Sequence, residues 1–117
     1  MIRVAVDAMG GDYAPEEIIA GAVDAVKENK EIKVLLVGQE QVVREKLSGF
    51  TYDKNQITVV HASEVIATEE PPVNAIRKKK DSSIVVGMNL VKNKEADAFV
   101  SAGSSGAILV GGQVIVG

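Results

Sequence analysis

The stretch Ala96-Asp97-Ala98-Phe99-Val100-Ser101-Ala102-Gly103-Ser104-Ser105-Gly106-Ala107 decides the predicted fold. Its beginning is a short apolar run that ends in β-favouring residues, which is typical of a buried parallel strand. A loop of small residues follows, and the apolar run that begins at Ile108 suits a buried helix. A strand, a small-residue loop and a helix start together favour anion binding, because the backbone can approach the ligand and the first helical N–H groups point at it. A tight turn whose serine caps the helix is the alternative, and it stays open at this point.

Working outward from this loop, strand-like and helix-like patterns alternate along the chain. Runs of apolar and β-branched residues predict parallel strands at residues 2–6, 32–37, 57–60 and 96–100. Apolar faces at helical spacing, together with capping residues, predict helices that begin near Pro15, Glu40 and Ser82. The alternation indicates one α/β domain over residues 1–117, with an open, doubly wound parallel sheet and helices on both faces.

The predicted sheet also gives the candidate site a location. In open parallel sheets, ligands bind beyond the carboxyl ends of the strands. Two glycine-rich loops leave from that edge, one with Gly10 and Gly11 after the first strand and one with Gly103 and Gly106 after the fourth. The two loops are therefore expected to border one site.

The composition limits the function classes. Only 3% of the 117 residues are aromatic and the net charge is −3, so base stacking and a polyanionic partner are disfavoured and no nucleic acid is expected. The chain has no cysteine, hence no disulfide framework and no thiolate chemistry. An acid at position 7 comes too early for a secretory signal, and the apolar stretch 107–117 is shorter than the ~20 residues that span a bilayer. A cytoplasmic location is expected.

The aspartates of the first loop have two interpretations. Asp7 and Asp12 bracket Gly10 and Gly11, and a carboxylate beside a phosphate is repulsive. Either they hold a metal or orient hydrogen-bond donors, or they satisfy loop N–H groups, as aspartates in turns commonly do. The second interpretation is favoured for Asp12, whereas Asp7 ends a buried strand and is harder to explain that way.

Three known motifs compete for the serine loop. A P-loop would need a Gly-Lys-Ser/Thr ending, which is absent. A dinucleotide fingerprint matches Gly103 and Gly106 but has Ser101 in place of its first glycine. A nucleophile elbow would use Ser105 as nucleophile and His61, the only histidine, as base. The elbow is disfavoured, since a lone histidine that closes a strand is far more often structural.

The one basic run is Arg77-Lys78-Lys79-Lys80. It would dock an acidic partner or attract an anion. On composition alone, the favoured interpretation is a solvated helix end whose cations complement the helix dipole.

Three separate motifs then point to a family. They are Asp7-Ala8-Met9-Gly10-Gly11-Asp12 followed by Ala14-Pro15, then Glu69-Glu70-Pro71-Pro72-Val73-Asn74-Ala75-Ile76-Arg77-Lys78-Lys79-Lys80-Asp81-Ser82-Ser83, then Ser101-Ala102-Gly103. In order and spacing, over essentially the whole chain, they resemble the bacterial phosphate acyltransferase family (PlsX). The N-terminal hexapeptide is the most specific of the three.

The resemblance implies acyl transfer in phospholipid synthesis, in which inorganic phosphate attacks the thioester of a fatty acyl–acyl carrier protein and gives acyl-phosphate. It implies a fold similar to isocitrate and isopropylmalate dehydrogenases, and a homodimer in the cytoplasm or loosely associated with the membrane. No cofactor and no metal are expected. Phosphate or substrate is expected at a set of residues from both loops: Asp7, Gly10, Gly11, Asp12, Ser101, Gly103, Ser104, Ser105 and Gly106. The basic run gains weight as a docking site for the acidic carrier protein, through Arg77, Lys78, Lys79 and Lys80.

Two departures from the family pattern matter. The family loop is Ser-Ala-Gly-Asn-Thr-Gly-Ala, so Ser104 replaces an amide that both donates and accepts, and Ser105 replaces a threonine. Family members also continue beyond Gly117, so the chain is expected to be the N-terminal part of a longer architecture with an incomplete active site. The opposing hypothesis is a phosphate-binding or scaffold fragment without a catalytic role. The apolar stretch 107–117 is expected to self-associate, at least to a dimer.

Overall fold

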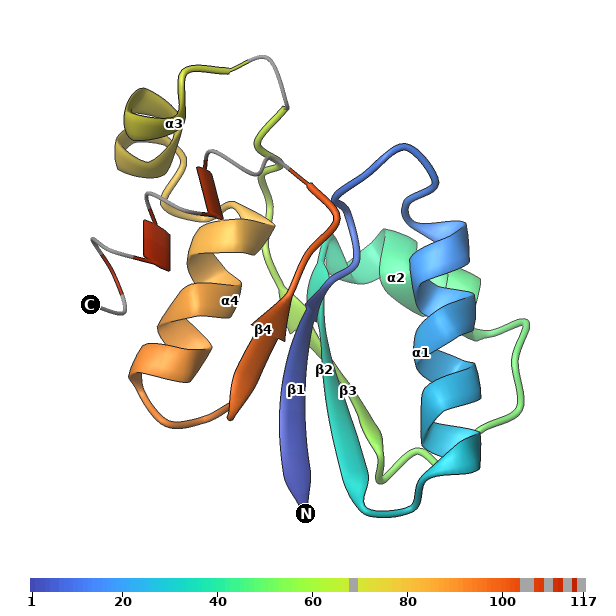
Figure 1. Ribbon diagram of the computed structural model, residues 1–117. Helices are drawn as coiled ribbons and strands as arrows, with labels where there is room; N and C mark the ends of the chain where they lie inside the picture. The colour runs from blue at the N-terminus through green and yellow to red at the C-terminus, as the bar shows by residue number, and fades with distance from the viewer. Residues whose placement is uncertain (68–69, 104–106, 109–110, 113–114, 116–117) are drawn as a thin grey trace.

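The computed structural model describes residues 1–67, 70–103, 107–108, 111–112 and 115 (Figure 1). Strands and helices alternate along these residues, as the sequence predicts. The elements are β1 (Ile2–Asp7), α1 (Glu16–Glu28), β2 (Ile32–Gly38), α2 (Glu40–Leu47), β3 (Ile57–His61), α3 (Pro72–Lys78), α4 (Ser83–Lys92) and β4 (Ala98–Val100). Pro72 stands in the first turn of α3, where a missing N–H costs nothing.

The strands form one four-stranded parallel sheet in the order β3-β2-β1-β4. From β1 the chain winds outward through β2 and β3, and then returns across β1 to add β4 on its other side. Val4 of β1 pairs with Val34 of β2 and with Ala98 of β4. This order is that of a doubly wound sheet, so the predicted parallel α/β architecture is confirmed. The closer likeness to the dehydrogenases stays a prediction.

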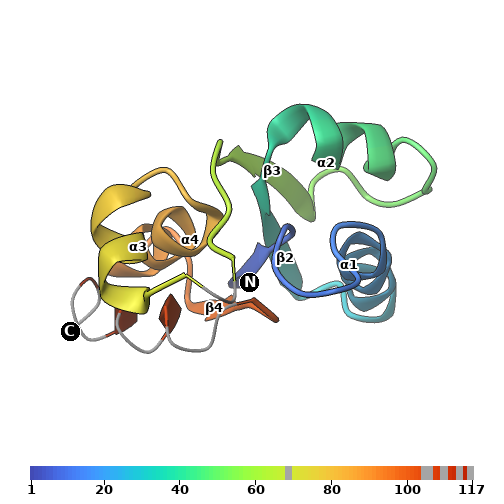
Figure 2. The same cartoon turned by 90° about the horizontal axis from the view of Figure 1, so that it is seen from above.

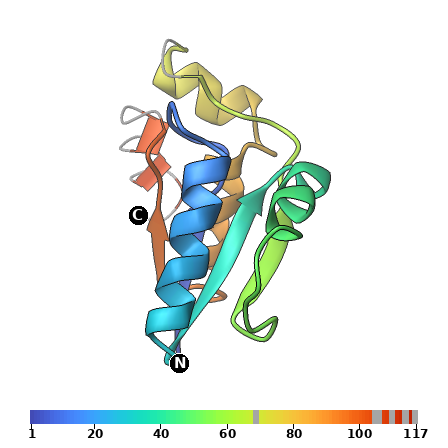
Figure 3. The same cartoon turned by 90° about the vertical axis from the view of Figure 1, so that its right-hand side faces the viewer.

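Helices cover the sheet from both sides. Seen from above, α1 and α2 lie on one side of the strands and α3 and α4 on the other (Figure 2). Figure 3 shows α1 lying along the sheet. Ile19, Val23 and Val26 of α1 recur at helical spacing and are buried against Leu36 of β2 and Val43 of α2. This side holds the largest of the apolar clusters found among the described residues.

The other side is organised by α4. Ser82 is its N-cap, as predicted, and the Ser82 Oγ accepts the Val85 N–H at 3.2 Å. A Cβ on Gly87 would collide with the ring of Phe99, so this glycine lets β4 approach the helix closely. The prediction of a buried β4 is wrong: Val100 is 55% exposed. In the described part of the chain, β4 is an edge strand with a helix over one face only.

Parts of the apolar stretch 107–117 are described, and they pack against other residues of the chain. Ala107 is fully buried, and a Cβ on Gly111 would meet the Met88 Sδ at 2.5 Å. Ile115 packs against the apolar cluster that contains Met88 and Ala107. The remaining residues of the stretch lie outside the described part, and self-association stays a prediction. No helix within the described residues is long and apolar enough to cross a membrane.

Candidate functional site

The loops that follow β1 and β4 meet at the carboxyl edge of the sheet. Val6 of β1 pairs with Val100 of β4, so the two strands end side by side. The chain leaves β1 toward α1 on one face and reaches β4 from α4 on the other (Figure 2). In open parallel sheets, such a reversal opens a crevice between the two strands, and ligands bind there. The structure therefore brings the first glycine-rich loop and residues 101–103 of the second together where the sequence predicts a site.

A buried carboxylate joins these loops. Asp7 is the last residue of β1 and is only 1% exposed. The Met9 N–H donates to its Oδ1 at 2.9 Å, and the Ser101 hydroxyl donates to its Oδ2 at 2.8 Å. The Ser101 Oγ in turn accepts the Gly103 N–H at 3.0 Å. The Ser101 hydroxyl and the Gly103 N–H therefore both donate to side-chain atoms of the protein. Asp7 holds the two loops in place.

The two loops approach so closely that only glycine fits at the contact. A Cβ on Gly10 would stand 2.5 Å from the Asp7 Oδ2 and 2.9 Å from the Gly103 nitrogen. Gly11 has φ +97°, in the left-handed region that favours glycine, and a Cβ there would meet the Ala102 Cβ at 3.0 Å. We call Gly10, Gly11 and Gly103 the glycine wall.

A cleft of about 210 Å³ opens beside the glycine wall. It is lined by Met9, Gly10, Gly11, Asp12, Val65, Ile66, Ala67 and Gly103. The backbone N–H groups of Gly10, Gly11 and Asp12 donate to no acceptor among the described residues. Consecutive free N–H groups around a left-handed glycine are a common way to bind an anion. Three residues that line the cleft thus carry N–H donors with no acceptor in the described part of the chain.

Residues 65–67 form the other side of the cleft, which we call the outer wall. They belong to the irregular segment between β3 and α3, and Ile66 is only 3% exposed. The Lys79 Nζ donates to the Val65 carbonyl at 2.9 Å and to the Glu70 Oε2 at 2.8 Å. That same Glu70 oxygen accepts the Ala67 N–H at 2.6 Å. Sequence reasoning missed the outer wall and Glu70, because no local pattern marks a contact nine residues apart.

The basic run is divided by these contacts. Arg77, Lys78 and Lys80 are exposed at the end of α3, whereas Lys79 is partly buried and engaged with Glu70. The hydrogen bond from Lys79 lowers the pKa of the Glu70 carboxyl below its ordinary value. Lys79 therefore makes contacts within the protein, whereas Arg77, Lys78 and Lys80 are the cations of the run that are exposed to solvent.

His61, the base that a nucleophile elbow would need, makes a structural contact at the start of α2. It is the last residue of β3, which is the outer strand of the sheet on the side away from β4. Its Nδ1 accepts the Glu40 N–H at 3.1 Å and so caps the start of α2. His61 thus has a structural contact, as the favoured interpretation expects, and its position relative to Ser105 stays untested. Ser104, Ser105 and Gly106 themselves lie outside the described residues.

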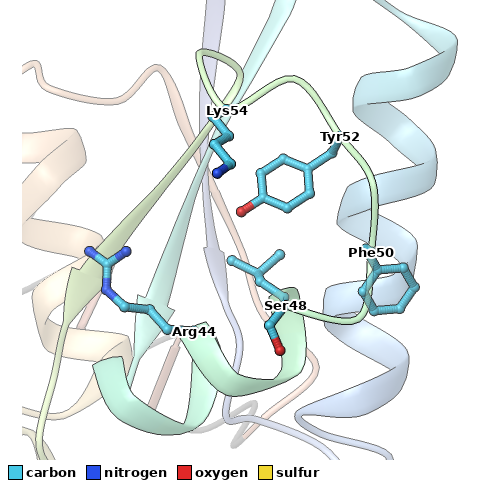
Figure 4. Close-up of a pocket in the computed structure, with 6 residues that line it drawn as sticks. Arg44, Ser48, Phe50, Tyr52 and Lys54 are labelled. Atoms are coloured by element: carbon cyan, nitrogen blue, oxygen red, sulfur yellow. The ribbon is translucent and has the colours of Figure 1, made fainter.

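A second pocket lies away from the glycine loops. Its volume is about 340 Å³, and it lies between α2 and the loop that leads to β3 (Figure 4). Arg44, Tyr52 and Lys54 are among the side chains around it. Arg44 also pairs with the Glu40 Oε2 at 3.5 Å. None of the residues predicted to be functional lines this pocket, so the candidate site is the cleft at β1 and β4.

The fold and the cleft define the class: a doubly wound parallel α/β domain with a cleft at the loops that follow β1 and β4. The chain belongs to the family described as "Fatty acid synthesis protein", whose model matches residues 2–117. The family resemblance carried by the three sequence motifs is thereby confirmed.

Curated relatives extend this comparison. Proteins named phosphate acyltransferase from Syntrophomonas wolfei and Clostridium tetani are 53% and 48% identical to the chain over 116 residues. These matches cover 99% of this chain but 36% and 35% of the respective relatives. The phosphate acyltransferase of Clostridioides difficile is 44% identical, over 99% of the chain and 34% of the relative. The chain thus spans about a third of the length of the curated relatives it matches.

Proposed function

We propose that the chain supplies the phosphate-binding part of a phosphate acyltransferase active site. The reaction moves a fatty acyl group from acyl carrier protein to inorganic phosphate and gives acyl-phosphate for phospholipid synthesis. The observation that carries the proposal is the cleft at β1 and β4, where the N–H groups of Gly10, Gly11 and Asp12 have no acceptor among the described residues. The names of the relatives support the choice of phosphate as the anion.

The chemistry asks the protein to position phosphate rather than to supply a nucleophile. A phosphate oxygen attacks the thioester carbonyl carbon; the new C–O bond forms, the C–S bond breaks, and the thiolate leaves to take up a proton. Backbone donors that hold phosphate near the thioester supply orientation and charge stabilisation. Within this proposal Gly10, Gly11 and Asp12 bind phosphate through the backbone, and Asp7 and Ser101 hold the loops. Ser104, Ser105 and Gly106 stay proposed ligands from outside the described residues.

Phosphate binding can be tested on the chain itself. We expect phosphate to shift the amide NMR signals of Gly10, Gly11 and Asp12 in a saturable titration, with little shift when an equal ionic strength of chloride is used. Amide signals at the second pocket, such as that of Lys54, serve as an internal control. Saturable shifts that centre on Lys54 instead would contradict this site.

The incomplete-site hypothesis has a separate test. Acyl-phosphate formation from an acyl carrier protein thioester is expected to be undetectable with these 117 residues alone, even where phosphate binds. Robust turnover by the chain would show that its site is complete.

The exposed part of the basic run is the proposed docking surface for the carrier protein. Arg77 and Lys80 border an apolar groove of about 280 Å³ between α3 and α4, and Lys78 lies beside them on α3. Cations around an apolar groove suit an acidic partner with an apolar anchor. Arg77→Glu with Lys80→Glu is expected to weaken carrier-protein binding about tenfold or more, because like charges then face the partner. Lys92→Glu, at the end of α4, is the matched control for a charge reversal.

The remaining family-based proposals concern assembly and location. We propose a homodimer in the cytoplasm, with peripheral membrane contact. Light scattering of the chain at increasing concentration tests the dimer, and a stable monomer at high concentration would contradict it.

A further inference from the structure

The outer wall of the cleft is held by an unusual means. Residues 65–67 belong to no strand or helix, and apart from one turn bond, from the Glu70 N–H to the Ala67 carbonyl at 3.2 Å, no backbone hydrogen bond among the described residues holds them. Instead, the backbone groups on either side of Ile66 are each held by a charged side chain: the Val65 carbonyl by Lys79, and the Ala67 N–H by Glu70. The two side chains are joined to each other at 2.8 Å. We call Lys79 and Glu70 the latch.

The latch is arranged to fix position rather than to supply charge. Its two side chains are about a third exposed, 31% for Lys79 and 27% for Glu70, and each neutralises the other. Both also reach back to the backbone of one short segment, so that the bonds restrain residues 65–67 from both ends. Charge-assisted hydrogen bonds of this kind are roughly twice as strong as neutral ones. Lys79 thereby differs from Arg77, Lys78 and Lys80, which have solvent-exposed side chains.

We propose that Lys79 and Glu70 are positioning residues that hold residues 65–67 against the glycine wall and so keep the cleft shaped for phosphate. This inference rests on the proposed function, because it assigns a role to the walls of the phosphate cleft. The latch acts through the outer wall and touches neither phosphate nor the thioester. When the latch is broken, the outer wall moves away from the glycine wall, water enters the cleft, and the oriented donors hold phosphate less well.

The decisive variant is Lys79→Met, which keeps the length of the side chain but removes its charge and its donors. Phosphate titration of the ¹⁵N-labelled chain, followed at the Gly10 and Gly11 amides, is expected to give a Kd roughly tenfold higher than for the wild type. Lys79→Arg is expected to restore most of the affinity, since it can still reach the Val65 carbonyl and Glu70. Lys92→Met, the same substitution at the end of α4, is the matched control and should bind phosphate as the wild type does.

A second readout locates the effect on the outer wall. Hydrogen exchange at the Ala67 amide is expected to accelerate in Glu70→Ala, which removes its acceptor, while exchange at the Gly103 amide stays slow. If Lys79→Met proves too unstable to titrate, Glu70→Gln carries the same test, because it removes the charge at constant size. Its phosphate Kd is also expected to rise.

The outcomes separate this inference from the proposed function. No saturable phosphate binding by the wild type would overturn both. Wild-type binding together with unchanged affinity in Lys79→Met and Glu70→Gln would overturn the latch alone. A rise in Kd for Lys79→Met, rescue by Lys79→Arg and no change for Lys92→Met would support it.

Discussion

The two walls of the cleft are built by different physical means. The glycine wall stands directly on the ends of β1 and β4, and its loops share one carboxylate that is 1% exposed. The outer wall lies in irregular chain, and a solvent-accessible ion pair ties it to the end of α3. The glycine wall thus follows directly from two strands of the sheet, whereas the outer wall is held by side-chain contacts at the end of α3.

Because of this difference, we expect the glycine wall to be rigid and the outer wall to be adjustable. Hydrogen bonds to a buried carboxylate are shielded from water and salt on one side, so the glycine wall should keep its shape over a wide range of conditions. A partly exposed ion pair is weakened by acid and screened by salt, so the outer wall should respond to both. The predictions below test each wall in turn.

Asp7→Ala is expected to have the largest effect. The Met9 N–H and the Ser101 hydroxyl lose their shared acceptor and a buried hole remains, so the free energy of unfolding should fall by about 3 kcal/mol. Denaturant unfolding measures the change. Asp7→Asn keeps the volume and one acceptor, and should cost clearly less. An Asp7→Ala variant as stable as the wild type would show that the carboxylate does not join the loops.

Gly10→Ala should follow in size. The new methyl group would stand 2.5 Å from the Asp7 Oδ2 and 2.9 Å from the backbone of Gly103, so the loops must separate. We expect a loss of about 2 kcal/mol in unfolding free energy and weaker phosphate binding.

Gly21→Ala is the control for this glycine replacement. Nothing lies within 4 Å of a Cβ at that position of α1, so alanine should stabilise the helix by about 0.5–1 kcal/mol. Equal destabilisation by both alanines would mean that close packing is not what requires glycine at position 10.

Ser101→Ala is expected to cost about 1 kcal/mol, since one hydrogen bond to Asp7 and one acceptor for Gly103 are lost. Thermal or denaturant unfolding is again the measurement. Ser48→Ala, at an exposed hydroxyl after α2, should change stability less. A larger loss for Ser48→Ala would reverse the ranking that the part-buried contact between Ser101 and Asp7 predicts.

Acid is expected to have the smallest energetic effect of these changes, and it should act on the outer wall. Because the hydrogen bond from Lys79 lowers the pKa of Glu70, the pair contributes stability above the ordinary Glu value of 4.5. That contribution is lost as the pH falls through the lowered pKa. The Ala67 amide signal should therefore titrate below pH 4.5, and it should not do so in Glu70→Gln. A midpoint at or above the ordinary value would contradict the ion pair.

Much of the fold was predictable because its signals are local. The apolar runs of β1 to β4 and the capping serine of α4 occur where the structure has these elements. The burial of β4 was not predictable from its residues, because an apolar strand looks the same at the centre and at the edge of a sheet. The exposure of Val100 follows from which elements lie beside it, and a local pattern does not contain that information.

For the site, the sequence by itself determined that two glycine-rich loops leave the same edge of a parallel sheet. Strand periodicity and the right-handed βαβ connection suffice for that. Only the tertiary structure decided that Asp7 turns inward to hold Ser101, 94 residues away in the chain, and that Lys79 is used by Glu70 rather than left free. The physical reason is that a carboxylate or an ammonium takes the partner that folding brings within hydrogen-bond distance, and contacts between distant segments have no local signature.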